Sequence, residues 1–178
     1  MAQAKRKKRM FNVELSLIKK ITQLIGYEPK DLDGRNISYD LTRMLKGKGS
    51  TLRFKLKVEN GKGTTKADQF KIMSYYLKRI ARKGTDYVED SFTIDSTDSE
   101  LRIKPILITR RKVSRAVKKT LREDTKKELI EWAKDKDSQT LIGEILKNKI
   151  QKELSLKLKK VYPLSVCEIR MLEVKKFK

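Results

Sequence analysis

The sequence predicts an α+β fold, and three observations lead to this class. Apolar and polar residues alternate in several short segments of the first 111 residues, as they do in half-buried strands. Between residues 112 and 162 the apolar residues recur at spacings of three and four, which is typical of amphipathic helices. Pro163 ends that pattern, and residues 164–175 again have the pattern of a strand. We therefore expect several antiparallel strands, two long late helices and a last strand that returns to the sheet.

The first half of the chain is expected to fold mainly as strands. Alternation predicts strands over residues 11–18, 37–42, 52–58 and 63–71. The pattern is unclear around Ile21 and Ile25, where the boundaries stay open. The Asn60-Gly61 dipeptide predicts a tight hairpin turn. A short helix is expected between Ile72 and Gly84, since apolar residues recur on one side of it.

The second half should contain one more hairpin, then helices, then the final strand. Residues 87–95 and 101–110 have the pattern of two strands around a turn at 96–99. An apolar stripe from Val113 to Trp132 predicts a helix over 112–135, and a second helix is expected from Asp137 or Ser138 to Tyr162.

The N-terminal arm is expected to be disordered in isolation. Residues 1–10 show no helix or strand pattern and hold five consecutive cations, Lys5, Arg6, Lys7, Lys8 and Arg9. We expect these to become ordered only when they bind between phosphates. Residues 11–178 are then expected to form a single domain, with strands mainly in 11–111, helices in 112–162 and a final strand at 164–175.

Charge points to a polyanionic partner. The chain has 45 Lys and Arg against 23 Asp and Glu, a formal net charge of +22 and no histidine. Such a surplus is best explained if many of the cations contact phosphates and release condensed counterions there. RNA and DNA are therefore the first partners to consider.

The composition also excludes several classes. Cys167 is the only cysteine, so neither an intrachain disulfide nor a Cys/His zinc site is possible, which fits a reducing cytosol. We interpret Cys167 as a small apolar residue on a strand. No apolar run is long enough to span a bilayer, and no signal-peptide core follows the basic N-terminus. We expect a cytoplasmic protein with no membrane partner, no cofactor and no homo-oligomer.

The strongest candidate for phosphate binding is a basic passage from the expected strand 101–110 into the helix that follows it. Arg115, Lys119 and Arg122 share one helical face, whereas Val117 and Leu121 take another. No acid occurs between Arg110 and Arg122, so this is an unusual composition for a merely solvated face. The candidates in this passage are Arg102, Lys104, Arg110, Arg111, Lys112, Arg115, Lys118, Lys119 and Arg122.

Two further basic groups accompany it. Arg43, Lys46 and Lys48 lie at a strand end and in a glycine-bearing turn, whose backbone amides could approach phosphates or whose glycines could serve only the turn. Arg79, Arg82 and Lys83 follow Tyr75 and Tyr76. These tyrosines could stack on unpaired bases, although aromatic residues at helical spacing more often belong to a core.

Catalysis has no good candidate. Glu89, Asp90 and Asp95 could hold Mg²⁺ in a nuclease, but Glu89 and Asp90 are adjacent on a strand and point to opposite faces. Pairing with neighbouring cations is the simpler interpretation. No Ser-His-Asp, P-loop, GxGxxG or HExxH pattern occurs.

Three strings resemble a known family. YVEDSF from Tyr87, followed by RIKPILITRRKVSRAVKKTLR, resembles the archaeal and eukaryotic small-subunit ribosomal proteins of the S3Ae type. DLTRMLKGK at 40–48 resembles that family's early strand and turn, and QKELSLKLKKVYPLSVCEIRMLEV at 151–174 resembles its last helix and final strand. The similarity runs in the same order over about residues 35–174. The long C-terminal extension of eukaryotic members is absent, which suggests an archaeal-type member.

The resemblance implies a barrel-like antiparallel sheet followed by two helices. It also implies a position on the small-subunit platform near the mRNA exit, with contacts to small-subunit rRNA and to neighbouring platform proteins, and no catalytic activity. We therefore interpret the chain as a structural rRNA-binding protein. It is expected to recognise the RNA through phosphate contacts and RNA shape, because side chains cannot enter the narrow A-form major groove. A basic chromatin-like or regulatory DNA-binding module is the alternative.

Overall fold

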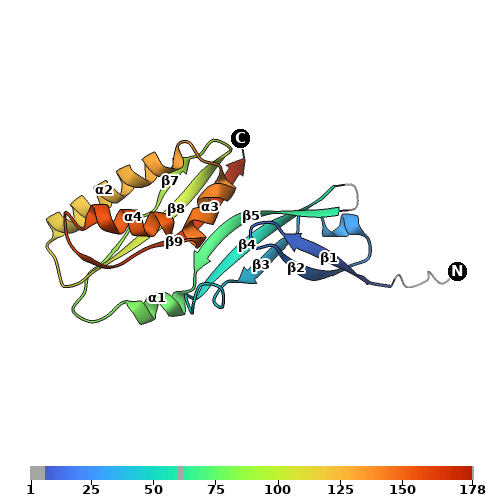
Figure 1. The fold of residues 1–178 in the computed structure, drawn as a ribbon, viewed down its shortest axis with the longest axis horizontal. Helices are drawn as coiled ribbons and strands as arrows, with labels where there is room; N and C mark the ends of the chain where they lie inside the picture. The colour runs from blue at the N-terminus through green and yellow to red at the C-terminus, as the bar shows by residue number, and fades with distance from the viewer. Residues whose placement is uncertain (1–6, 60–61, 178) are drawn as a thin grey trace. The chain divides into compact units, whose positions relative to one another are not determined.

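A computed structural model describes residues 7–59 and 62–177, and the class is α+β with a mostly antiparallel sheet (Figure 1). The expected turn at Asn60-Gly61, together with Lys5 and Arg6, lies outside the described residues. The chain divides into two compact units, residues 1–39 with 52–68, and residues 40–51 with 69–178. Strands β4 (Ser50–Glu59) and β5 (Lys62–Ile72) contribute residues to both units.

The first unit is built from hairpins. β1 (Arg9–Leu15) pairs antiparallel with β2 (Lys20–Gly26), and a 3-10 helix follows at Pro29–Leu32 before β3 (Asn36–Asp40). Its buried side chains come from these elements and from β4 and β5, and they include Val13, Leu15, Leu32, Phe54 and Leu56. Thr65 on β5 accepts a hydrogen bond at its Oγ1 from the Ser16 amide (3.1 Å) and so ties the end of β1 to this core.

The second unit contains the helices and the rest of the sheet. Its elements are α1 (Ser74–Ile80), β6 (Tyr87–Glu89), β7 (Phe92–Asp95), β8 (Ser99–Thr109), α2 (Arg115–Ala133), α3 (Ser138–Leu146), α4 (Lys149–Leu158) and β9 (Leu164–Phe177). β8 and β9 pair antiparallel along almost their whole length, from Ser99 opposite Phe177 to Thr109 opposite Leu164. Helices α2, α3 and α4 cover one face of this sheet (Figure 1).

The helices are held to the sheet by a dry apolar layer. Leu121 of α2 and Leu158 of α4 are no more than 1% exposed and pack with Val88 of β6 and Leu107 of β8. Burying a side chain of this size contributes about 1.5–3 kcal/mol. The layer fixes α2 on β8, and so fixes the loop between them.

The sheet is open in the described residues. Its strands follow the order β3-β4-β5-β9-β8-β6, with β7 also paired to β8, so β3 and β6 stand at the two ends. The barrel-like sheet that the family resemblance implied is therefore not confirmed. β6 and β7 replace the single strand expected over 87–95, because the chain bends at Asp90, whose Oδ1 accepts from the Ser91 amide (2.8 Å).

The single long helix expected up to Tyr162 was wrong in two respects. It is interrupted, since α3 ends at Leu146 and α4 begins at Lys149, and it ends at Leu158. Asn148 between them has φ +55°, in the left-handed region, which interrupts an α-helix and which asparagine tolerates better than most residues. The other long helix begins at Arg115, because the Ser114 Oγ accepts from the Val117 amide and caps it.

Candidate nucleic-acid interface

Exposed cations concentrate in the loop between β8 and α2 and on the first half of α2. Arg110, Arg111 and Lys112 are exposed in the loop, and Arg115, Lys119 and Arg122 are exposed on the helix, whereas Leu121 is buried. We call these six cations the α2 ridge. In the part of the chain that the structure describes, Lys119 alone among them has an ion pair, to Glu123 at 3.9 Å, and both side chains are more than half exposed. Such pairs contribute little, so the ridge stays strongly positive.

The loop that carries the ridge is held in shape by an internal acid. Asp86 accepts from the Val113 amide (2.8 Å) and pairs with the Lys118 ammonium (3.0 Å). The hydrogen bond from Val113, followed by that from Lys118, holds the pKa of Asp86 below its ordinary value. Lys118 therefore anchors the loop from inside, because its charge is paired with Asp86.

Arg102 and Lys104 lie on a different surface from the ridge. Side chains alternate along β8, and Leu107 faces the helices because it packs with Leu121 and Leu158. Arg102 and Lys104 are an odd number of residues from Leu107, so they lie on the sheet face away from the helices. Arg102 donates from Nε to Ser91 Oγ (3.2 Å) there. The passage that looked continuous in the sequence is thus divided between two faces.

A cleft in the second unit unites two of the other basic groups. It has a volume of about 520 Å³ and is lined by Leu45, Lys46, Gly47, Lys48, Tyr76, Arg79, Asn148, Gln151, Lys152, Cys167 and Glu168. Lys46 and Arg79, which were assigned to separate groups from sequence, share its rim with Lys152, which sequence reasoning missed. Its lining comes from the 41–49 loop, α1, the start of α4 and β9.

Lys48 belongs to the interior of this cleft. It is 8% exposed, and its ammonium contacts Glu168 Oε2 at 2.5 Å and donates to Asn148 Oδ1 at 3.1 Å. A cation held in this way is a structural element of the loop 41–49 and has little freedom to bind phosphate. Lys46 next to it has φ +52° and is exposed, so the loop presents one lysine outward and the other inward.

The floor of the cleft contains an amide with an unmatched acceptor. Gln151 is 4% exposed, and its Nε2 donates to the Ile145 carbonyl (3.0 Å). This bond fixes the amide orientation, and Oε1 finds no hydrogen-bond partner among the described residues. Leaving a buried acceptor unmatched costs about 1–3 kcal/mol.

The remaining side chains of the cleft are aromatic and apolar. The Arg79 guanidinium lies 5.3 Å from the centroid of the Tyr76 ring. Burial, reinforced by the Glu168 carboxylate, raises the pKa of Tyr76. Burial also raises the pKa of the Cys167 thiol to about 12, so the thiol stays protonated and packs as a small apolar group, as expected.

The other basic candidates are dispersed. Arg43 is exposed before the cleft loop, and Arg82 and Lys83 are exposed after α1. Of the arm, Lys7 and Lys8 precede β1 and are exposed, and Arg9 is the first residue of that strand. Lys8 lies 5.8 Å from the Tyr27 ring centroid within the first unit.

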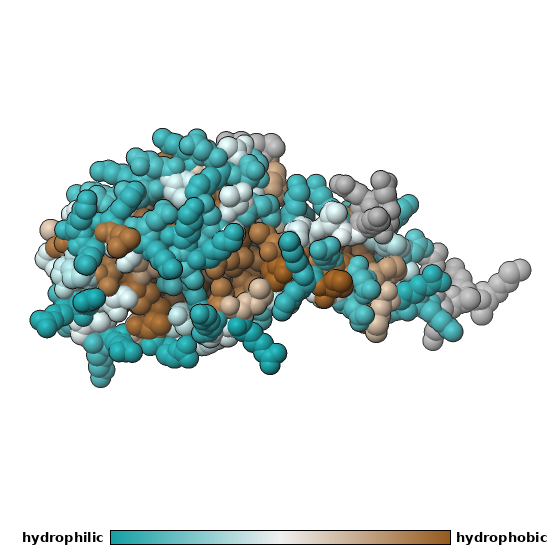
Figure 2. Space-filling view, in the orientation of Figure 1, coloured by the Kyte–Doolittle hydropathy of each residue, from teal (hydrophilic) through white to brown (hydrophobic). Residues whose placement is uncertain are grey.

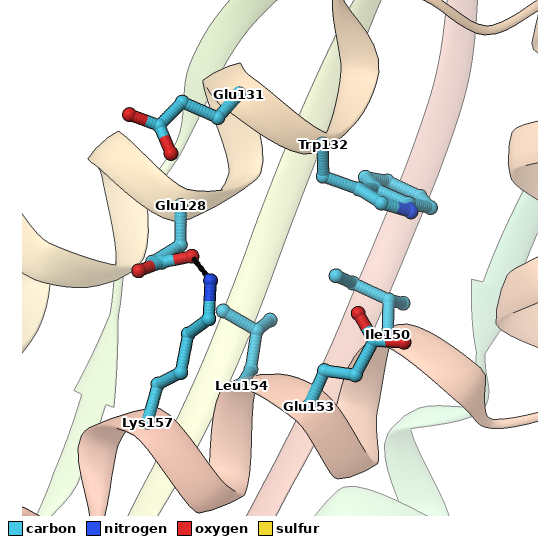
Figure 3. Close-up of a pocket in the computed structure, with 7 residues that line it drawn as sticks. All are labelled: Glu128, Glu131, Trp132, Ile150, Glu153, Leu154 and Lys157. Atoms are coloured by element: carbon cyan, nitrogen blue, oxygen red, sulfur yellow. Dashed lines mark hydrogen bonds and ion pairs between the residues drawn. The ribbon is translucent and has the colours of Figure 1, made fainter.

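The second half of α2 has the opposite chemistry (Figure 3). Glu128, Glu131 and Glu153 line a groove of about 240 Å³ between α2 and α4, with Trp132, Ile150, Leu154 and Lys157. Glu128 ion-pairs with Lys157 across it. Three carboxylates against one ammonium repel phosphate, so this groove is no part of an RNA-binding surface.

The carboxylates considered for catalysis are engaged in the fold. Glu89 ion-pairs with Arg170 and accepts from the Tyr87 hydroxyl (3.0 Å). In residues 7–59 and 62–177 no group of three metal-binding side chains could hold an ion.

Within the same residues, every helix is too short or too polar to cross a bilayer. Around the helices, hydrophilic side chains cover most of the surface that Figure 2 shows.

Comparison with known proteins confirms the family resemblance. The small ribosomal subunit protein eS1 of Nanoarchaeum equitans is 28% identical over 146 residues, which cover 78% of this chain and 72% of the relative. The eS1 protein of Methanothermobacter thermautotrophicus is 30% identical over 120 residues, 66% of this chain and 62% of the relative. The eS1 protein of Halorubrum lacusprofundi is 25% identical over 155 residues, which cover 84% of this chain and 72% of the relative. The model of the Ribosomal S3Ae family matches residues 5–177, and this chain therefore belongs to that family.

Proposed function

We propose that this protein is a structural constituent of the small ribosomal subunit and binds small-subunit rRNA through the α2 ridge. The observation that carries the proposal is the ridge itself, six exposed cations on a helix and loop that are fixed to the sheet. Like charges at helical spacings of three and four repel one another, so their concentration is explained if phosphates neutralise them. Its archaeal relatives carry the name small ribosomal subunit protein.

The mode of recognition follows from the side chains. Arg110, Arg111 and Arg115 can each form bidentate bonds with phosphate oxygens, and Lys119 adds a point charge. These contacts read the position of the RNA backbone and not its sequence, as an A-form helix requires. The role is assembly and support of the subunit during translation in the cytoplasm, without catalysis. The proposal includes a position on the platform near the mRNA exit, which the family resemblance supports.

A neighbouring platform protein is the proposed partner for the acidic groove. Its floor is formed by Trp132, Ile150 and Leu154, and Glu131 and Glu153 are exposed at its edge (Figure 3). A Lys or Arg side chain can lay its apolar stem on such a floor and its charge on the carboxylates. Helix α2 would then contact RNA with its first half and protein with its second.

The test is incorporation into ribosomes. The variant Arg111→Glu, Arg115→Glu, Lys119→Glu reverses three ridge charges, and Lys127→Glu, Lys134→Glu, Lys147→Glu is the matched control at exposed cations outside the ridge and the cleft. Tagged proteins are expressed in cells and followed across sucrose gradients at moderate and high salt. We expect the ridge variant to remain folded but to leave the small-subunit fractions, and the control to stay in them.

Two outcomes would argue against the proposal. Normal incorporation of the ridge variant would remove the ridge from the RNA interface. Migration of the unaltered protein away from small subunits, combined with a preference for duplex DNA over structured RNA at matched salt, would favour the DNA-binding alternative.

A further inference from the structure

The cleft between the 41–49 loop, α1 and α4 has a cationic rim, an aromatic wall and a polar floor, and few kinds of ligand would use all three. Its rim carries Lys46, Arg79 and Lys152, all exposed. Among the described residues none of the three has an ion pair with a carboxylate. The rim is therefore suited to an anion, and three cations around one opening suit a phosphate.

One wall of the cleft is an aromatic ring. Tyr76 is half-buried, and the guanidinium of Arg79 lies 5.3 Å from its centroid. A planar aromatic ligand can stack on such a ring, and the planar guanidinium of Arg79 can also stack on that ligand. An inorganic anion or an acidic peptide would leave this wall unused.

The floor is polar but carries no net charge. Lys48 and Glu168 neutralise each other there, and Asn148 and Gln151 contribute two amides. The Asn148 Oδ1 accepts from the Lys48 ammonium, which leaves the NH₂ group of the Asn148 amide as a donor. A donor of this kind can bind an acceptor on the edge of a nucleobase.

We propose that this cleft binds one unpaired nucleotide of RNA, with its phosphate at the rim, its base on Tyr76 and the edge of that base toward Asn148. The proposal rests on the proposed function and deepens it, because it adds a site for an unstacked base to a surface that otherwise contacts only phosphates. The volume of about 520 Å³ lies within the usual range of small-ligand sites. A base within a duplex cannot enter, since it must first leave the stack.

The test compares the binding of an RNA oligomer that has its bases with the binding of the same oligomer without them. A short fluorescein-labelled single-stranded RNA is titrated with the protein by anisotropy, beside the same oligomer in which every base is replaced by an abasic residue. Stacking of a base on an aromatic side chain changes affinity by about tenfold or more. We expect that loss on the unaltered protein and on Tyr87→Leu, a control at a tyrosine outside the cleft, and little loss on Tyr76→Leu, which has no ring on which a base can stack.

Equal loss on all three proteins, or no loss on any of them, would overturn the proposal. Photocrosslinking of an oligomer that contains 4-thiouridine gives a second measurement on the unaltered protein. Crosslinks on the peptide that contains Tyr76 support the cleft, and crosslinks confined to α2 overturn it.

The two proposals fail in different ways. If the base makes no difference while the ridge variant still fails to enter small subunits, the cleft proposal falls and the ribosomal role stands. If the unaltered protein itself stays out of small subunits, the proposed function falls, whatever the cleft binds.

Discussion

Substitution of Lys48 by methionine should destabilise the protein well beyond the loss of a surface ion pair. The Lys48 and Glu168 side chains are 9% and 18% exposed, and their charged atoms lie 2.5 Å apart. Methionine keeps the length of the stem but removes the ammonium, so the Glu168 carboxylate stays in place with neither its counter-ion nor that donor. Removing one partner of a buried pair costs about 3–5 kcal/mol. Because Glu168 keeps some contact with water, we expect about 2–4 kcal/mol.

The matched control removes both charges. In Lys48→Met, Glu168→Gln no uncompensated charge remains in the cleft, so about half of the loss should be recovered. The free energy of unfolding is measured by urea denaturation at constant slope, and thermal unfolding gives an independent value. For a chain of this length, a loss of about 3 kcal/mol in the free energy of unfolding lowers the midpoint of thermal unfolding by roughly 6–12 °C. A single variant that loses less than about 1 kcal/mol, or a double variant as unstable as the single, would refute this reasoning.

Two further predictions concern stability in the second unit. Burial opposes ionisation of Asp98, but hydrogen bonds from the Ser138 hydroxyl (2.7 Å) and amide (3.0 Å) outweigh it and hold the pKa of Asp98 below its ordinary value of 3.8. Its contribution is therefore complete above pH 3.8 and is lost as the pH falls through the lowered pKa, so the difference in melting temperature between the native protein and Asp98→Asn should be clear at pH 6 and shrink below about pH 3.8. A β-carbon at Gly49 would lie 2.2 Å from the Tyr75 hydroxyl oxygen, at the far end of an exposed side chain that can move aside, so Gly49→Ala should destabilise by no more than about 1 kcal/mol in urea denaturation. Adding Tyr75→Ala, at a side chain that is 57% exposed, should restore most of that loss, and a double variant no more stable than Gly49→Ala would contradict the steric explanation.

The elements with a clear hydrophobic period could be predicted from sequence, and the others could not. The strand at β4 and the long helix α2 were expected because their buried residues keep the spacing of two or of three and four. β2 was unclear since Ile21 and Ile25 are 71% and 52% exposed, so its apolar residues do not mark a buried face. The break at Asn148 depends on one backbone angle, which no hydrophobic period encodes.

The candidate site shows the same division. The exposure of the α2 ridge follows from helical spacing, which is local information. The cleft depends on packing between distant segments: Lys48 meets Glu168 across 120 positions of the sequence, and Lys152 approaches the loop of Lys46 only through α4. The role of Lys118 was missed for a similar reason. Its partner Asp86 lies on another element, so the sequence places Lys118 in a basic run while the fold uses it internally.

Helix α2 has its side-chain charges arranged against its own macrodipole. The partial positive charge at the start of a helix is usually balanced by acids, but here the first turn holds none and Arg115 and Lys119 stand near it. Carboxylates such as Glu128 and Glu131 follow toward the end, where the partial charge is negative. Of these residues only Arg115 and Glu131 lie in the terminal turns, where a mismatch costs about 0.3–1 kcal/mol at low ionic strength.

The free protein should therefore hold the start of α2 less firmly than the protein bound to phosphates does. Amide hydrogen exchange in the first two turns is expected to slow when sulfate is added at constant ionic strength, and unchanged exchange there would contradict this view. If the ridge binds rRNA as proposed, phosphates would take the place of the acids missing from the first turn of α2. Assembly would then complete a helix terminus that the chain alone leaves unbalanced, and the start of α2 should be cut by proteases more slowly in assembled subunits than in the free protein.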